Sequence, residues 1–145
     1  MAGGVLVAGL AATWAMVGIV WFVQIVHYPM LRHGAGPGFS AIAEEHARRT
    51  GRVVGPLMAV EAATALWLLV DRPEGVPLWT AALAAALLAV VWALTAFVQV
   101  PHHAALRRGF SAATHRALLA GNAVRTAVWS ARGAVVAGMA ITAVT

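Results

Sequence analysis

The chain has 145 residues, of which 61% are hydrophobic and only 10% are charged, whereas soluble proteins average about 45–50% apolar and about 25% charged residues. Ten basic and five acidic side chains are too few to cover a water-soluble domain, so the composition excludes an ordinary soluble enzyme, a disordered chain and a coiled coil. The absence of cysteine excludes disulfides, thiolate nucleophiles and iron–sulfur clusters. In such a chain the net charge of +5 informs on membrane orientation more than on nucleic-acid binding.

Four apolar segments are each close to the length of about 20 residues that spans a bilayer. They cover residues 3–26, 53–70, 78–100 and 117–144. Only helices and closed barrels satisfy their backbone in lipid, and continuous apolar runs favour helices. We therefore predict an all-α fold, a polytopic membrane four-helix bundle that forms one domain over residues 1–145. Pro29 and Pro101 are predicted to close the first and third helices.

Arginine is concentrated in two of the connections between these segments. The first and third connections carry Arg32, Arg48, Arg49, Arg52, Arg107, Arg108 and Arg116. The second connection carries only Arg72. Because positively charged loops stay in the cytoplasm, we predict a multi-pass protein of the bacterial inner membrane with extracytoplasmic N- and C-termini.

A short sequence occurs once in each half of the chain. The tetrapeptide Gly-Phe-Ser-Ala at residues 38–41 recurs at residues 109–112. Each copy follows a segment that ends in Gln, His and Pro residues. This repeat indicates two related helix pairs, an arrangement that often places a ligand site at the interface between the repeats. A chance match in a chain rich in glycine and alanine is the alternative.

All the histidines lie in or beside the two arginine-rich connections. They are His27, His33, His46, His102, His103 and His115. Neutral imidazole is the commonest metal ligand, and one end of a four-helix bundle brings loops and helix ends together. The alternative is that these histidines hold no cofactor and lie at the membrane interface, where they cap helices or contact lipid phosphate.

Two of these histidines end a helix beside a glutamine and a proline. Gln24 and His27 are spaced i, i+3, so they share one helix face. Gln99 and His102 have the same spacing, and both glutamines are predicted to be buried. We predict His27 and His102 as the first ligands of a haem or a transition metal. Further candidate metal ligands are His46, His103 and His115.

Charged residues inside the apolar segments give a second candidate site. Glu61 lies in the middle of the second segment, and the fourth carries a polar stripe at helical spacing of Asn122, Arg125, Trp129 and Arg132. A carboxylate in lipid needs a partner, so we expect Glu61 to face Arg125 or Arg132. The pair either fixes helix register or belongs to a clamp for an anion or a quinone oxygen.

Four short motifs carry a family resemblance. They are Gln24-x-x-His27-Tyr28-Pro29, Pro56-Leu57-Met58-x-x-Glu61, Gln99-Val100-Pro101-His102 and Asn122-x-x-Arg125-Thr126-x-x-Trp129. Across most of the chain their layout resembles an uncharacterised group of small bacterial four-helix integral membrane proteins. More distantly, it is similar to the four-helix haem-binding bacterial protoporphyrinogen oxidase. That resemblance implies haem binding, although Asn122-Ala123-Val124 replaces the Asn-Glu-Pro of that family.

From these signals we predict an integral membrane redox protein, an oxidoreductase or oxygenase. Histidines at the cytoplasmic end hold its haem or metal, and Asn122 and Arg125 hold the acidic or carbonyl part of a lipophilic substrate or cofactor. The alternative is a non-enzymatic binding protein or carrier for a small anion or proton, using Glu61, Arg125 and Arg132. The expected partners are membrane lipids and a lipophilic small molecule, with no nucleic acid; a homo-oligomer stays open.

Overall fold

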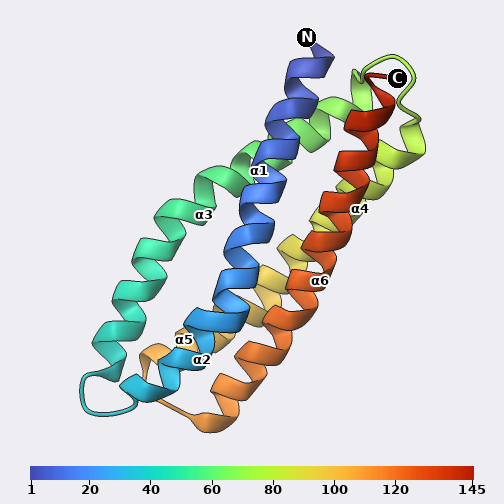
Figure 1. Cartoon of the computed structure of the whole chain (residues 1–145). Coiled ribbons are helices and arrows are strands. Elements are labelled where there is room, and N and C mark those ends of the chain that lie inside the picture. The colour runs from blue at the N-terminus through green and yellow to red at the C-terminus, as the bar shows by residue number, and fades with distance from the viewer.

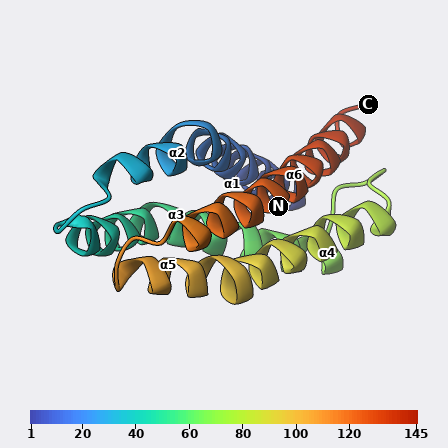
Figure 2. The same ribbon diagram turned by 90° about the horizontal axis from the view of Figure 1, so that it is seen from below.

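The computed structural model describes residues 1–145 and contains no strand. Four long helical arms run alternately up and down (Figure 1), namely Ala2–Gly34, Phe39–Val70, Leu78–Arg107 and Ala112–Thr142. The elements in chain order are α1 (Ala2–Phe22), η1 (Val23–His27), α2 (Tyr28–Leu31), η2 (Arg32–Gly34), α3 (Phe39–Val70), α4 (Leu78–Leu94), η3 (Thr95–Gln99), α5 (Val100–Arg107) and α6 (Ala112–Thr142). α6 packs against both α1 and α4, and α3 contacts the same two helices (Figure 2). The predicted all-α four-helix bundle is confirmed.

Three of the arms are long and apolar enough to cross a membrane, namely Ala2–Gly34, Phe39–Val70 and Leu78–Arg107. The fourth arm, α6, has a similar length of 31 residues but carries charged residues in its middle. Arg132 is only 2% exposed, so α6 keeps this charge inside the bundle, as membrane helices do. Both termini lie at the same end of the bundle as the turn at residues 71–77 (Figure 1).

The outer surface of the bundle is rich in apolar side chains, and several polar side chains are buried inside it. Large apolar side chains face outward, and Phe97 and Trp79 are 81% and 66% exposed. Polar side chains are buried instead, including Glu61, Asn122 and Gln99, none of which is more than 1% exposed. An exposed apolar surface of this extent marks contact with another apolar phase, and lipid is the phase that suits helices of this length.

The second arm begins at Phe39 and not near residue 53, which corrects the predicted boundary. Arg48, Arg49 and Arg52, which were assigned to a loop, therefore lie on the N-terminal part of α3. Glu45 forms ion pairs with Arg48 at i+3 and Arg49 at i+4, and such pairs support an exposed helix. A fall in hydropathy therefore marks where α3 leaves the apolar zone, not where the helix ends.

The two predicted helix-closing prolines lie within continuous arms, which is a second correction. A π-helical turn precedes each of them: η1 before Pro29 and η3 before Pro101. Proline has no N–H and its ring clashes with the carbonyl four residues earlier. The wider π turn relocates that carbonyl with one extra residue, so the helix bends and continues.

The two halves of the bundle correspond element by element. Pro29 and Pro101, 72 residues apart, both follow a π turn. Phe39 and Phe110, 71 residues apart, pack their rings edge to face with centroids 5.2 Å apart. These matches support two related helix pairs. They also show that His27, which ends η1, corresponds to Gln99, which ends η3, and not to His102 as the sequence suggested.

Candidate ligand-binding cavity

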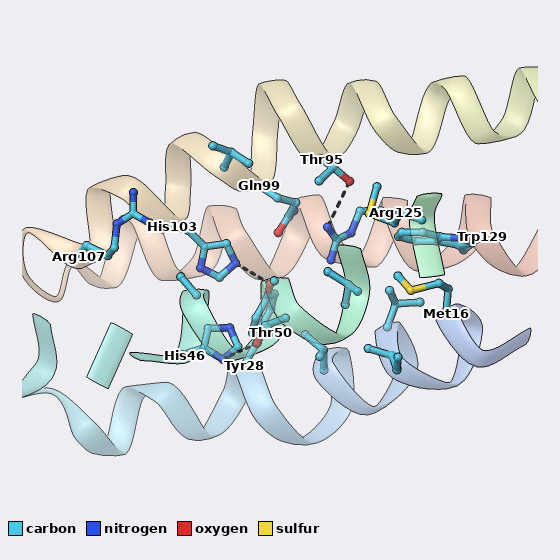
Figure 3. Close-up of a pocket in the computed structure, with 18 residues that line it drawn as sticks. Met16, Tyr28, His46, Thr50, Thr95, Gln99, His103, Arg107, Arg125 and Trp129 are labelled. Atoms are coloured by element: carbon cyan, nitrogen blue, oxygen red, sulfur yellow. Dashed lines mark hydrogen bonds between the residues drawn. The ribbon is translucent and has the colours of Figure 1, made fainter. Parts of the chain in front are cut away.

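A cavity of about 260 Å³ lies inside the bundle, between α1, α3, α6 and the third arm (Figure 3). Most of its wall is apolar, from residues such as Met16, Val20, Val54 and Met58. The polar side chains on the wall are Tyr28, His46, Thr50, Thr95, Gln99, His103, Arg107 and Arg125, of which Arg107 pairs with Glu44 at 3.3 Å. An apolar pocket with a few convergent polar groups is the usual form of a small-molecule site.

Arg125 is the charged group in the centre of this wall. Its Nη1 donates to Thr95 Oγ1 at 3.3 Å and its Nη2 donates to Asn122 Oδ1 at 2.9 Å. The guanidinium carbon lies 5.5 Å from the centroid of the Trp129 ring, which is within range of a cation–π interaction. Its Nε is buried without a partner, and none of the ion pairs in the structure includes Arg125.

Asn122 is positioned by a further amide. Its Nδ2 donates to Gln24 Oε1 at 2.8 Å, which turns its carbonyl oxygen toward Arg125. Gln24 belongs to η1 and Asn122 is fully buried in α6, so this contact ties the first π turn to the fourth arm. Asn122 and Arg125, which were predicted to bind a ligand, are therefore hydrogen-bonded to each other. Gln24 fixes the orientation of the Asn122 amide.

Gln99 supplies the second unusual polar group. Its side chain is 1% exposed, and neither Oε1 nor Nε2 has a hydrogen-bond partner. A buried polar group without a partner costs about 1–3 kcal/mol. Gln99 lines the cavity beside Thr95 and Arg125 (Figure 3), so a ligand in the cavity could satisfy its amide.

Tyr28 and His103 form the third polar feature. Tyr28 Oη and His103 Nε2 share a hydrogen bond of 2.8 Å, although 75 residues separate them in sequence. Tyr28 is 3% exposed. Its backbone carbonyl accepts a hydrogen bond of 2.7 Å from Nε2 of the buried His115. His115 therefore holds the backbone of Tyr28.

The remaining histidines are arranged in a row at the loop end. The His46 ring lies between those of His27 and His103, with centroid distances of 4.3 Å and 5.5 Å. His46 Nδ1 shares a hydrogen bond of 3.1 Å with Thr50 Oγ1. His102 has a buried, unpartnered Nδ1 and makes no ring contact with this row.

The cavity contains neither a three-ligand metal site nor the room that a porphyrin needs. No group of three or more histidine, aspartate and glutamate side chains is placed to hold a metal ion. The nitrogens of His103 and His115 that point inward already bond to Tyr28. A cavity of about 260 Å³ is below the range of about 300–1,000 Å³ of ordinary ligand pockets, and a porphyrin would overfill it.

Glu61 and Arg132 lie outside the cavity and form a buried ion pair, in which Arg132 Nε has no partner of its own. Arg132 Nη1 is 3.4 Å from Glu61 Oε1, and both side chains are at most 2% exposed. Trp129 Nε1 donates to both carboxylate oxygens at 3.1 and 3.2 Å, and Arg132 also donates to Thr13. The partner of Glu61 is therefore Arg132 and not Arg125. The two residues are 71 apart, the same separation as the paired phenylalanines.

Sequence reasoning missed the role of Tyr28. The available signal was that it is the only tyrosine of the chain and stands between His27 and Pro29. Thr95 was missed because a threonine in an apolar helix commonly bonds to its own backbone, as Thr95 Oγ1 does to Val91 O at 2.8 Å.

No protein-family model, curated protein or solved structure matches the chain.

Proposed function

We propose that this chain is an integral membrane protein that binds a small lipophilic molecule through one anionic or carbonyl oxygen on Arg125. The observation that carries the proposal is a guanidinium inside an apolar cavity with no carboxylate partner and an unpaired Nε. The unpaired amide of Gln99 beside it offers a second hydrogen bond to the same ligand.

The chemistry of the cavity selects the ligand class. A buried cation without a counter-charge is costly, and an anion forms charge-assisted, often bidentate, hydrogen bonds with arginine. The apolar wall suits a hydrocarbon or aromatic body. Because the outer surface of the bundle is apolar, we propose that this molecule enters from the bilayer.

The other predicted functions receive less support from this geometry. A membrane redox protein with a haem or metal stays a prediction, and no step of the present proposal uses such a group. The carrier of an anion or proton required Glu61, Arg125 and Arg132 together. Since Glu61 and Arg132 neutralise each other, only Arg125 is left to bind a ligand.

Replacing Arg125 by glutamine should weaken binding of 2-naphthoate by about 10- to 100-fold. The expectation follows from the loss of a charged hydrogen bond worth about 1.5–3 kcal/mol. Binding is measured by titration calorimetry on the protein in phosphatidylcholine nanodiscs, with empty nanodiscs as the blank.

The matched control is Arg108→Gln, since Arg108 is an exposed arginine outside the cavity. It should leave the affinity unchanged, and 2-naphthalenemethanol should bind the unchanged protein more weakly than 2-naphthoate does. Wild-type protein that takes up no more 2-naphthoate than empty nanodiscs, or an Arg125→Gln variant with unchanged affinity, would overturn the proposal.

We also propose that the chain lies in the bacterial inner membrane with both termini outside. Arginines of α3, α5 and the loop at residues 108–111 lie at one end of the bundle, and the termini lie at the other (Figure 1). Reporter fusions after Arg72 and at the C-terminus should both give extracytoplasmic activity. A C-terminal fusion active only in the cytoplasm contradicts this orientation.

A further inference from the structure

We propose that Tyr28 and His103 form an acid–base pair that removes a proton from the molecule bound at Arg125. The cavity would then generate an enolate or phenolate and hold it as an ion pair. This inference rests on the proposed binding function and adds a reaction to it: proton abstraction from a lipophilic ketone or phenol.

The geometry gives the pair access to a ligand. Tyr28 Oη is 2.8 Å from His103 Nε2, and both side chains line the cavity that contains Arg125 (Figure 3). A general base must lie within hydrogen-bond reach of the proton it takes. Tyr28 meets this condition on one side and passes the proton to an imidazole on the other.

The step balances without an oxidant or a metal. The acidic C–H or O–H proton of the ligand moves to Tyr28 Oη while the phenolic proton of Tyr28 moves to His103 Nε2. The electron pair of the broken bond stays on the ligand, whose oxygen becomes anionic. Arg125 and the Nε2–H of Gln99 stabilise that oxygen, as donors placed where charge develops do in other enzymes.

No carboxylate competes with His103 for this role. Its charged and titratable neighbours are His46 on α3, Arg107 on α5, Arg125 on α6 and His27 on η1. Two carboxylates lie at this end of the bundle, and both are paired. Glu44 lies 3.3 Å from Arg107 Nε. Glu45 forms ion pairs with Arg48 and Arg49 on α3. His103 is the group whose Nε2 shares a hydrogen bond with Tyr28 Oη, so the contact, and not the charge of its neighbours, assigns it the proton.

His46 lies between the cavity and the loop end of the bundle. It lines the cavity and also two grooves that open to the outside at the loop end, both of which include His27 and Arg49. The His46 ring lies between those of His103 and His27. We expect the proton to reach water through these openings, and His46→Gln, which changes the side chain between His103 and the grooves, should slow the exchange.

The test is deuterium exchange into 2-tetralone, an enolisable bicyclic ketone, by protein in phosphatidylcholine nanodiscs in D₂O. Proton NMR follows the loss of the signal from the acidic C1 hydrogens. We expect wild-type protein to exceed empty nanodiscs by about 100-fold or more, the usual contribution of general acid–base catalysis. Tyr28→Phe and His103→Gln should return the exchange rate, measured at saturating 2-tetralone, to the background.

The control is His33→Gln, the same change at an exposed histidine outside the cavity, which should exchange 2-tetralone at the wild-type rate. If wild-type protein binds 2-naphthoate but exchange equals that of empty nanodiscs, the acid–base role is wrong and the binding function stands. If Tyr28→Phe also loses binding, His103→Gln decides: wild-type exchange in that variant overturns the proposal, and background exchange with intact binding supports it.

Discussion

Replacing Glu61 by leucine should destabilise the folded bundle by about 3–5 kcal/mol, the usual cost of leaving a buried charge without its partner. Arg132 is 2% exposed and would then keep only its hydroxyl partner, Thr13. Trp129 Nε1 would also lose the carboxylate to which it donates. The free energy of unfolding is measured by titration with SDS in mixed micelles.

The double variant, in which both Glu61 and Arg132 become leucine, is the control. Apolar residues can replace a buried ion pair at little net cost, so the double variant should be more stable than either single variant. Equal or additive losses in the double variant would show that the pair does not act as a unit.

Replacing Gly121 by alanine should destabilise the bundle by about 1–2 kcal/mol, despite the better helix propensity of alanine. An added Cβ would lie 2.7 Å from Val98 Cγ1 and 2.8 Å from Gln99 Nε2, so the side chains of Val98 and Gln99 must shift. Since Gln99 lines the cavity, the same change should lower the affinity for 2-naphthoate.

Gly138→Ala is the matched control on the same helix. No atom lies within 4 Å of its added Cβ, so this substitution should stabilise α6 by up to about 1 kcal/mol. The two substitutions should thus shift the unfolding midpoint in opposite directions. Similar shifts for both would mean that α6 and η3 are not packed closely at Gly121.

The buried ion pair and the polar face of the fourth helix could be predicted, because they involve polar residues within apolar segments. In lipid, a carboxylate such as Glu61 must find a partner, and the stripe on the fourth helix limited the choice to Arg125 or Arg132. The helical spacing of Asn122 and Arg125 likewise placed them on one face. These inferences need only local periodicity and the cost of charge in an apolar phase.

Other features could not be read from local signals. Proline rules assume an α-helix, and the π turns that carry the chain through Pro29 and Pro101 leave no mark in composition. The contact between Tyr28 and His103 joins two arms, and its alignment depends on how η1 and η3 turn the helices. The spacing of histidines along the chain therefore suggested a ligand cluster, whereas packing gave one of them a phenol as its partner.

The correspondence of the two helix pairs has a consequence for what one chain can build. Two identical helix pairs around a two-fold axis place the same residue at both equivalent positions. At Glu61 and Arg132, 71 residues apart, such an assembly would bring two carboxylates or two guanidiniums together. A neutral pair therefore needs two halves that are encoded separately. The same holds in the cavity, which is lined by both Val54 of α3 and Arg125 of α6. These two residues are 71 apart and occupy equivalent positions in the two halves. A molecule bound there meets a guanidinium from one half of the chain and an apolar side chain at the equivalent position of the other half, which leaves it a single direction in which to lie.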